Sequence, residues 1–330
     1  MAQATRLHVS ELIHDDPATL AGIHKVPVIF GHNMLDVITP DDDYLAAVIE
    51  RAAKAGPMHY NLSVVERDEN GRERWVQGLL AREGEAADGH AVLEMIKAGR
   101  LWLQVEHLAE LVPEMAQLAR QAYDEIRRKV PGFTYFNLYC NLLISGPNAR
   151  VTPHIDVAEV FLFHLRGHKR MTLWDPDEFP VPDSARESII LREQLEDIHI
   201  KPEWEDKGIV AELAPGQGVN FPYMWPHAVD NLGDLNVSLQ TEYHYPASMR
   251  RYFALYAQGL ARRRLKANVR QDLKPGSVGE SLRAVPGLLA KALRLHSPRP
   301  RKVALEFVVD SGAADGVRWL AKNEQPVLTK

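Results

Sequence analysis

Six short β-like runs fill the middle of this 330-residue chain and constrain its fold more than any other feature. They lie at residues 133–145, 159–165, 169–174, 209–213, 218–221 and 235–243. Turn-forming residues separate several of them, including Gly146-Pro147-Asn148 and Gly167. Many short strands with turns between them are typical of a double-sheet jelly roll or barrel, so we expect a mainly β core.

The residues before this core have a mixed pattern. Thr39-Pro40, followed by three aspartates, predicts the start of a helix. Residues 58–66 and 72–80 are β-like, and Asn70-Gly71 between them predicts a hairpin turn. Helical spacing then follows, with apolar residues at Leu111, Met115, Leu118, Ala122 and Ile126.

The residues after the core are expected to be helical. Apolar residues recur on one face of a helix at Met249, Tyr252, Phe253, Tyr256 and Leu260. We therefore divide a single domain into three parts. An N-terminal mixed α/β region, 1–130, packs on and extends the core, 131–246. The C-terminal helical region, 247–330, follows.

Cysteine content and hydropathy bear on the compartment. Cys140 is the single cysteine, so no disulfide can form within the chain, and a reducing compartment fits. The first residues lack the apolar core of a signal peptide. No run approaches the ~18 apolar residues of a transmembrane helix. We therefore expect a soluble cytoplasmic protein.

Charge is unevenly spread along the chain. The net charge is −5, yet residues 249–302 contain 14 Lys and Arg against 2 Asp and Glu. A basic segment on an acidic protein can bind an anionic surface such as a membrane or a nucleic acid. It can also fold against the acidic remainder or a second subunit, and we favour this second interpretation.

Two candidate metal ligands follow the turn at 146–148. His154 and Asp156 are two residues apart, so on an extended backbone their side chains point to the same side of the sheet. They would form two-thirds of a 2-His-1-carboxylate triad, which suits non-haem Fe(II) with open coordination positions. His14 and Asp16 have the same spacing but lie in a polar loop with no strand pattern behind it, so we set them aside.

A third candidate ligand, His227, lies in the run from Gly216 to Asn231. The glycines of this run allow a tight turn into a strand, Pro222 stops that strand, and His227 opens the next. A histidine there can reach across a jelly roll to a pair on another strand, which would complete the triad. The competing histidines, which we interpret as core or solvent-facing side chains, are His164, His168 and His244.

Three separated motifs now stand in order along the chain: His154-x-Asp156, Gly167-x-Lys169-Arg170 and the run from Gly216 to His227. Together they resemble the JmjC and cupin-like family of Fe(II)/2-oxoglutarate-dependent oxygenases, in the branch that contains asparaginyl hydroxylases such as factor inhibiting HIF. The resemblance covers roughly residues 133–245. It implies a double-stranded β-helix (cupin-like jelly roll) core with His154, Asp156 and His227 as Fe(II) ligands.

The resemblance also implies contacts to 2-oxoglutarate as co-substrate. Lys169 would pair with its distal carboxylate, and Thr152 would share that carboxylate. Asn141 and Leu142 match an Asn-Leu pair on the strand that lines the pocket of the family. The branch has an asparagine four residues after the metal-binding aspartate, where this chain has Val160. The residues that could replace its contact to the 1-carboxylate are Asn236, Ser238 and Gln240.

The chemistry of a dicarboxylate agrees with these assignments. A buried dicarboxylate needs a fixed cation and hydroxyl donors to offset its desolvation. Tyr139 is one candidate for the hydroxyl, because it faces the same way as Asn141 on an alternating strand, and Tyr60 is a second. Arg170 points to the opposite face from Lys169 and replaces it only if the register is shifted by one residue.

We therefore predict an Fe(II)/2-oxoglutarate-dependent dioxygenase that hydroxylates a C–H bond of a peptide or small-molecule substrate, with release of succinate and CO₂. The alternative is a non-catalytic cupin-like protein that binds a metal or a small acid. As in the resembled branch, the C-terminal helices are expected to form a homodimer. The sequence leaves the substrate open among peptides, amino acids, lipids and sugars.

Overall fold

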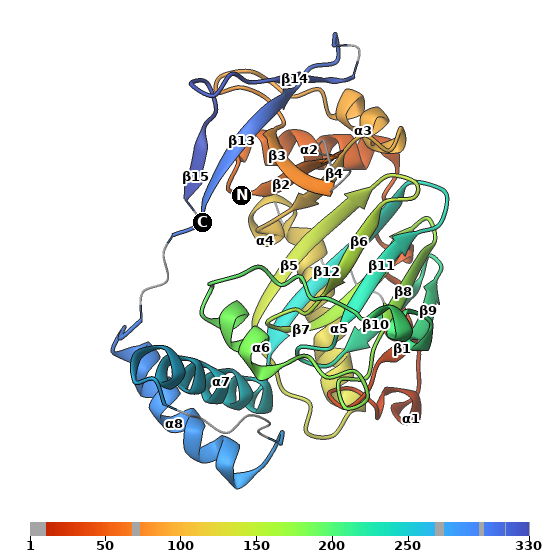
Figure 1. The fold of residues 1–330 in the computed structure, drawn as a ribbon. Helices are drawn as coiled ribbons and strands as arrows, with labels where there is room; N and C mark the ends of the chain where they lie inside the picture. The colour runs from red at the N-terminus through yellow and green to blue at the C-terminus, as the bar shows by residue number, and fades with distance from the viewer. Residues whose placement is uncertain (1–10, 68–72, 268–273, 297–299, 314, 330) are drawn as a thin grey trace, which may run out of the picture.

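Two β-sheets face each other in the computed structural model, which describes residues 11–67, 73–267, 274–296, 300–313 and 315–329 (Figure 1). The smaller sheet has the order β6-β11-β8-β9: β6 is Arg150–His154, β11 His227–Asn231, β8 Lys169–Leu173 and β9 Ile209–Leu213. The larger sheet begins with β1-β10-β7-β12-β5: β1 is Val28–Gly31, β10 Gln217–Phe221, β7 Glu159–Arg166, β12 Asn236–His244 and β5 Phe136–Ser145. All these strands pair antiparallel. The predicted jelly-roll core is confirmed.

The core fills both sides of the larger sheet. β7 is buried along almost its whole length, because its two faces pack against different layers. Val160 and Leu162 turn toward the smaller sheet and pack with Met171 and Leu173. Phe161 lies in the larger apolar cluster on the opposite side. A strand covered on both faces reads as a continuous apolar run, which is the pattern seen at 160–163.

The N-terminal part extends the larger sheet by three strands, β4 (Trp102–Val105), β2 (Tyr60–Arg67) and β3 (Glu73–Leu79). The predicted turn at Asn70-Gly71 lies outside the described residues, and the strands on either side of it pair antiparallel. The helices of this part are α1 (Pro17–Leu20), η1 (Met34–Asp36), α2 (Asp42–Ala55), α3 (Gly89–Lys97), α4 (Leu108–Leu111) and α5 (Pro113–Lys129). The Asp41 carboxylate caps α2 by accepting from Tyr44 N at 2.9 Å, so this helix begins later than Thr39.

The C-terminal part begins with the expected helices, α7 (Pro246–Arg264) and α8 (Val278–Ala292), which lie side by side (Figure 1). The prediction of a helical region up to residue 330 is wrong for its last part. Residues from Lys302 onward form β13 (Lys302–Val309), β14 (Val317–Trp319) and β15 (Val327–Thr329), and β13 pairs parallel with β3. The run 303–309 is rich in β-branched residues, which favour strands.

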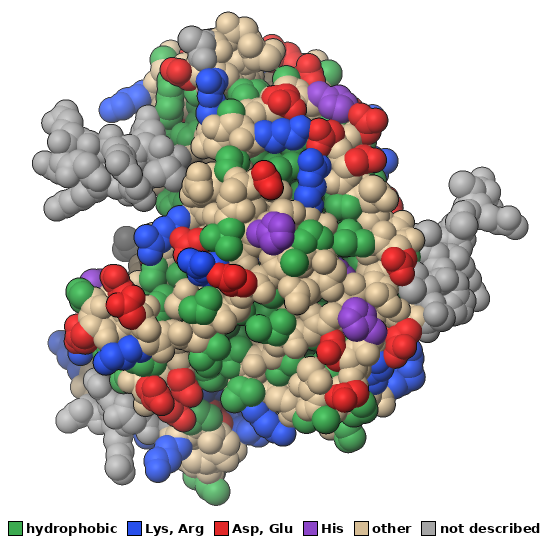
Figure 2. All heavy atoms as spheres, turned by 90° about the vertical axis from the view of Figure 1, so that its right-hand side faces the viewer, with side chains coloured by type: hydrophobic (Ala, Val, Ile, Leu, Met, Phe, Trp, Pro, Cys, Tyr) green, Lys and Arg blue, Asp and Glu red, His purple; other side chains and the backbone are tan. Residues whose placement is uncertain are grey.

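The basic C-terminal helices pair with an acidic insert between β8 and β9, which contains α6 (Asp183–Ile190) and η2 (Pro202–Lys207). Glu187 of α6 is fully buried and accepts hydrogen bonds from Gln258 Nε2 at 2.9 Å, Arg262 Nη2 at 3.1 Å and Arg263 Nη1 at 3.2 Å. Basic and acidic side chains also intermingle on the face shown in Figure 2. The helical part of the basic segment therefore folds against acidic residues of the same chain, as favoured above.

None of the described helices is both long enough and apolar enough to span a membrane.

Replacing Glu187 by alanine is expected to lower the free energy of unfolding by roughly 3 kcal/mol, because it leaves two partly buried arginines without their shared anion. Urea denaturation followed by circular dichroism measures this loss. The matched control is Glu193→Ala. Glu193 also pairs with Arg263, but it is partly exposed, so its loss should cost less than about 1 kcal/mol. Equal losses in the two variants would contradict this account of the insert.

Candidate metal centre and cavity

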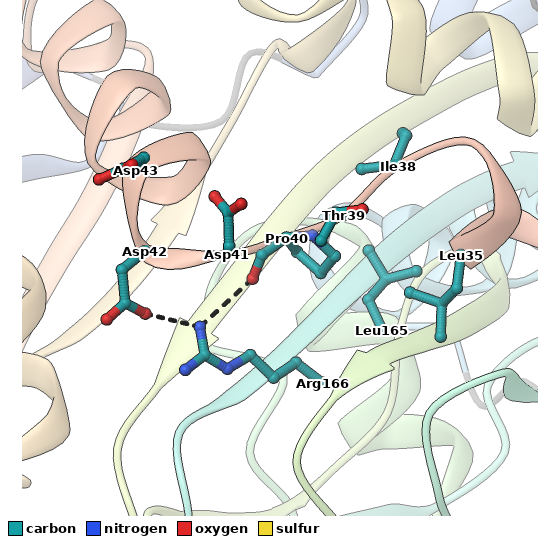
Figure 3. Close-up of a pocket in the computed structure, with 9 residues that line it drawn as sticks. All are labelled: Leu35, Ile38, Thr39, Pro40, Asp41, Asp42, Asp43, Leu165 and Arg166. Carbon is teal, nitrogen blue, oxygen red and sulfur yellow. Dashed lines mark hydrogen bonds and ion pairs between the residues drawn. The ribbon is translucent and has the colours of Figure 1, made fainter.

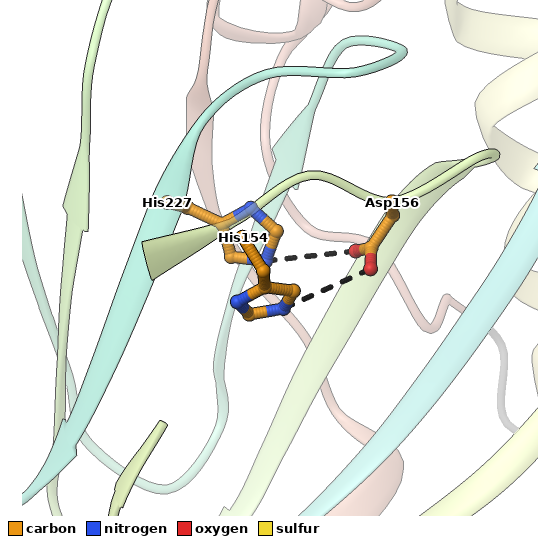
Figure 4. Close-up of side chains that lie close together, drawn as sticks. All are labelled: His154, Asp156 and His227. Atoms are coloured by element: carbon orange, nitrogen blue, oxygen red, sulfur yellow. Dashed lines mark ion pairs between the residues drawn. The ribbon is translucent and has the colours of Figure 1, made fainter. Parts of the chain in front are cut away.

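Three side chains meet where β6 ends and β11 begins (Figure 4). Antiparallel pairing places His154 directly opposite His227, and Asp156 follows two residues after His154. His154 Nε2 lies 3.8 Å from Asp156 Oδ1, and His227 Nε2 lies 3.5 Å from Asp156 Oδ2. The ligand atoms of all three residues lie within 4.8 Å of one another. The structure thus brings the three predicted ligands together.

Both imidazole rings are oriented by the backbone. His154 Nδ1 donates to Thr152 O and His227 Nδ1 donates to Trp225 O, each at 2.9 Å. Each Nε2 is left as the free acceptor, as in metal-binding histidines whose other nitrogen is held by a hydrogen bond. Burial, helped by the neighbouring His154, lowers the pKa of His227 to about 4, so this ring is neutral. A neutral ring is the form that binds a metal.

Asp156 provides the remaining evidence that a metal fits. Its Oδ2 atom is buried and has no hydrogen-bond partner among the described residues. A buried carboxylate oxygen is costly unless something pairs with it. A divalent cation bound by two neutral Nε2 atoms and this carboxylate would satisfy all three groups, and the set has the composition of the 2-His-1-carboxylate triad.

The triad opens into a cavity of about 230 Å³ between the two sheets. Lys169 lies in its wall, next to Asn231 in the register of β8 and β11. The Lys169 side chain is only 3% exposed and forms no hydrogen bond or ion pair with any described residue. Burial lowers its pKa to about 8. The Asn231 amide donates to Ser145 Oγ at 2.8 Å and to Gly146 O at 2.7 Å.

Two glutamates also line this cavity, Glu242 from β12 and Glu196 from the segment of the insert between α6 and η2. The insert reaches the site because Ile155 N donates to Glu196 O at 3.1 Å and His154 forms a β-bridge with Asp197. Burial of the Glu242 carboxyl group, together with repulsion from Asp156, raises its pKa to about 7. Desolvation at the rim of the cavity and repulsion from Asp156 also raise the pKa of Glu196, although the side chain of this residue is largely exposed.

Thr152 lies outside the lining of the cavity, contrary to expectation. His227 pairs with His154, but Val229 pairs with Val151, so β6 carries one extra residue between these pairs. Such a bulge changes the direction of the side chains it contains. The Thr152 hydroxyl is exposed and donates to Asp197 Oδ1 at 3.2 Å.

Of the other predicted co-substrate residues, all but Gln240 lie around the cavity without lining it. Tyr139 is on the same face of β5 but is 55% exposed, beyond the cavity. Asn141 donates to Glu242 Oε1 at 3.4 Å. Asn236 donates to Asp234 O at 2.9 Å, and the Ser238 hydroxyl is 3.0 Å from His164 Nδ1. Of the three candidates on β12, Gln240 is the one that lines the cavity.

The two alternative residues, Tyr60 in place of Tyr139 and Arg170 in place of Lys169, also lie outside the lining of the cavity. Tyr60 is buried, and its hydroxyl accepts from Leu80 N at 3.1 Å. Arg170 is on the opposite face of β8 and donates to Glu212 Oε1 at 2.7 Å through Nη2. The predicted register, with Lys169 inward and Arg170 outward, therefore agrees with the structure.

Sequence reasoning missed Ser145, Gln104, Glu196 and Glu242 as cavity residues. Gln104 reaches the cavity because β4 pairs with β5, which places it opposite Leu143. Glu242 alternates with Gln240 on a predicted strand, so period-2 spacing could have found it. Glu196 lies in an irregular insert, where no periodic signal exists.

A second hollow of about 670 Å³ lies at the start of α2 (Figure 3). Its polar groups bind one another: Arg166 Nη1 donates to Asp42 Oδ1 at 2.7 Å and to Pro40 O at 3.3 Å. Arg166 thus links the start of α2 to the end of β7 through hydrogen bonds. We therefore assign the hollow a structural role.

Comparison with known proteins agrees with the fold. Residues 67–249, more than half of the chain, match the family described as Cupin-like domain, and the chain belongs to this family. This confirms the predicted resemblance to cupin-like proteins.

Solved structures that resemble the chain include the Escherichia coli ribosomal oxygenase YcfD. In complex with cobalt and 2-oxoglutarate it is 17% identical, with a TM-score of 0.43 over 82% of this chain and 64% of that chain. This chain therefore spans less than two-thirds of that protein. A second YcfD structure gives 17% identity and a TM-score of 0.45 over 85% of this chain and 67% of that one. A cupin superfamily protein from Desulfitobacterium hafniense gives 13% and 0.21, over 33% of this chain and 70% of that one.

Replacing His154 or His227 by alanine is expected to abolish tight binding of one divalent ion per chain, because two ligands cannot hold the ion as three do. Metal content after dialysis against Mn(II) or Fe(II) measures this. His14→Ala is the matched control, since His14 belongs to the other His-x-Asp pair and should leave the stoichiometry at one. Full occupancy in the His154 and His227 variants would exclude the triad as the metal site.

Proposed function

We propose that this protein is an Fe(II)/2-oxoglutarate-dependent oxygenase that hydroxylates a C–H bond of a peptide or small-molecule substrate. One observation supports the proposal above all: Lys169, buried and without a partner among the described residues, lines the same cavity as the triad. A buried cation without a partner is costly, so this cavity is suited to an anionic ligand. 2-Oxoglutarate is a dicarboxylate, which can pair one end with Lys169 and direct the other end to the metal.

Each cavity residue has a role in this proposal. His154, Asp156 and His227 would hold Fe(II), which supplies O₂ activation and the oxidative decarboxylation of 2-oxoglutarate to succinate and CO₂. Lys169 would hold the distal carboxylate. Ser145 lies beside it, because its hydroxyl accepts from the amide of Asn231, the register neighbour of Lys169. This hydroxyl can donate its own proton to the same carboxylate.

In this chain, the end of 2-oxoglutarate that faces the metal would be held by residues other than those of the resembled branch. Val160 lines the cavity and offers an apolar surface only. Gln240 lines the same cavity from β12, where the next inward residue, Glu242, pairs with Val160. We propose that the Gln240 amide contacts the 1-carboxylate, in place of the asparagine of the resembled branch.

The apolar wall has a role as well. Leu162, Met171 and Phe221 belong to the apolar cluster between the sheets and also line the cavity. They exclude water from the space beside the metal, and a dry cavity strengthens the pairing of Lys169 with a carboxylate.

Replacing Lys169 by methionine is expected to weaken 2-oxoglutarate binding by roughly 10- to 100-fold, because a charge-assisted contact is lost.

The same variant should be more stable at pH 7 by on the order of 3 kcal/mol, since the buried ammonium is removed. Because the pKa of Lys169 is lowered to about 8, the destabilisation of the wild-type protein by its buried ammonium group is fully present below about pH 8. The gain should therefore shrink as pH rises from 8 toward the ordinary lysine value near 10.4. Calorimetry and urea unfolding measure the two effects.

The matched control is Arg170→Met, which removes the adjacent cation on the opposite face and should leave 2-oxoglutarate binding unchanged. Wild-type protein with Fe(II) should convert 2-oxoglutarate to succinate slowly even without substrate. Tight metal binding with no affinity for 2-oxoglutarate would contradict the proposal and favour the non-catalytic cupin-like alternative.

We also propose that α8 mediates homodimerisation. Seven of its apolar side chains, or those just beyond its end, are at least half exposed: Val278, Leu282, Val285, Leu288, Leu289, Leu293 and Leu295. At roughly 100 Å² each they form a patch larger than monomers usually expose and close to one side of a standard interface. Its helical face is the same on every copy, so a twofold axis can bury it against itself.

Replacing both Leu282 and Leu289 by glutamate is expected to convert a dimer into a monomer, because two buried charges without partners oppose association. Sedimentation velocity at micromolar concentration measures the mass. Val327→Glu, an equally exposed apolar position on β15, is the control that should remain dimeric. A monomeric wild-type protein would refute this interface.

A further inference from the structure

The two ends of the cavity are lined by different titratable groups. Lys169 and the hydroxyl and amide groups of Ser145 and Asn231 lie at one end, and Glu242 and Glu196 lie in the wall beside Asp156. The buried, unpartnered Lys169 shows independently that this cavity is built for a ligand. The two glutamates show that its polarity extends past the co-substrate.

The two glutamates have no cationic partner among the described residues. Glu242 is half-buried, and its Oε1 accepts only from the neutral amides of Asn141 and Gln240, each at 3.4 Å. Glu196 is at the exposed rim and forms no ion pair in the described part of the chain. Long contacts to neutral amides offset little of the cost of a half-buried carboxylate.

Other buried carboxylates of the chain are treated differently. Glu187 is paired with two arginines, Glu159 with His24, and Glu125 accepts from Leu12 N at 2.7 Å and Ile13 N at 2.8 Å. The fold therefore satisfies its structural carboxylates with groups of its own. The half-buried Glu242 lacks comparable partners, as does Glu196 at the exposed rim, and both line the candidate active site.

The balance of charges in a cavity that holds a metal ion and 2-oxoglutarate also favours a cationic substrate. A divalent ion and Lys169 together carry the charge that balances Asp156 and a dianionic 2-oxoglutarate. Glu242 and Glu196 then remain beside the position where a substrate must enter, with no cation left to pair with them. A positive group on the substrate would lower their raised pKa values, favour the ionised forms and pair with them.

We propose that Glu242 and Glu196 recognise an ammonium or guanidinium group of the substrate and hold it at the mouth of the metal cavity. This inference rests on the proposed oxygenase function and adds a substrate class to it. Tyr139 strengthens the site, because it is the cross-strand partner of Glu242 and its exposed ring can cover a cation.

The experiment compares charged and neutral probes of equal shape. Protein loaded with Zn(II) and 2-oxoglutarate is titrated by calorimetry with N-acetyl-arginine amide and with N-acetyl-citrulline amide, and likewise with the lysine and norleucine amides. At least one cationic probe should bind about tenfold more tightly than its neutral counterpart. Glu242→Gln and Glu196→Gln should each reduce this preference to about threefold or less.

Glu203→Gln is the matched control, because Glu203 is exposed on the same insert and lies outside the cavity wall, so it should keep the full preference. Unchanged metal content and thermal midpoint show that the Glu242 and Glu196 variants are folded. Equal affinity for charged and neutral probes, no binding of either cationic probe, or an unaltered preference in both variants would overturn the inference. Because metal and 2-oxoglutarate binding are measured in the same samples, failure of the proposed function would be seen separately.

Discussion

The pairing of β6 with β11 is the constraint on which the site depends. It sets His154 directly opposite His227 across two neighbouring strands. Both rings then receive their orientation from backbone carbonyls, so the free nitrogens converge without help from other side chains. The same strand β11 carries Asn231 beside Lys169 of β8. One short strand therefore positions both the triad and the Lys169 end of the cavity.

The cavity also shows how function opposes stability in this fold. The buried Lys169 and the half-buried Glu242, neither of which has an ion-pair partner among the described residues, raise the free energy of the protein when no ligand is present. The rest of the chain compensates with extensive apolar clusters on both sides of the larger sheet. Lys169, Glu242 and Glu196, which form no ion pair with any described residue, all line the cavity that contains the triad, and this combination identifies the cavity by its chemistry.

Local spacing in the sequence predicted the jelly-roll core and suggested His154, Asp156 and His227 as ligands, whereas Lys169 was implied by the resemblance to cupin-like oxygenases. Thr152 shows where such reasoning fails, because an extra residue in β6 breaks the alternation that placed it beside His154. The alternation of side chains along a strand also does not indicate how far along that strand the cavity extends. Tyr139 and Asn141 are on the correct face of β5, yet residues nearer its end line the cavity. Pairing of β4 with β5, which brings in Gln104, joins segments distant in sequence and leaves no local pattern.

The parallel pairing of β13 with β3 has a consequence for biosynthesis. Leu305 lies opposite Gln77, so the edge of the N-terminal sheet is completed by a segment that is synthesised long after β3 itself. Until that segment arrives, β3 presents an open strand edge, and such edges pair readily with other chains. Contacts this distant in sequence also form slowly. The nascent protein is therefore most exposed to misassembly at β3, far from the metal centre, and truncations that remove β13 would prolong that exposure.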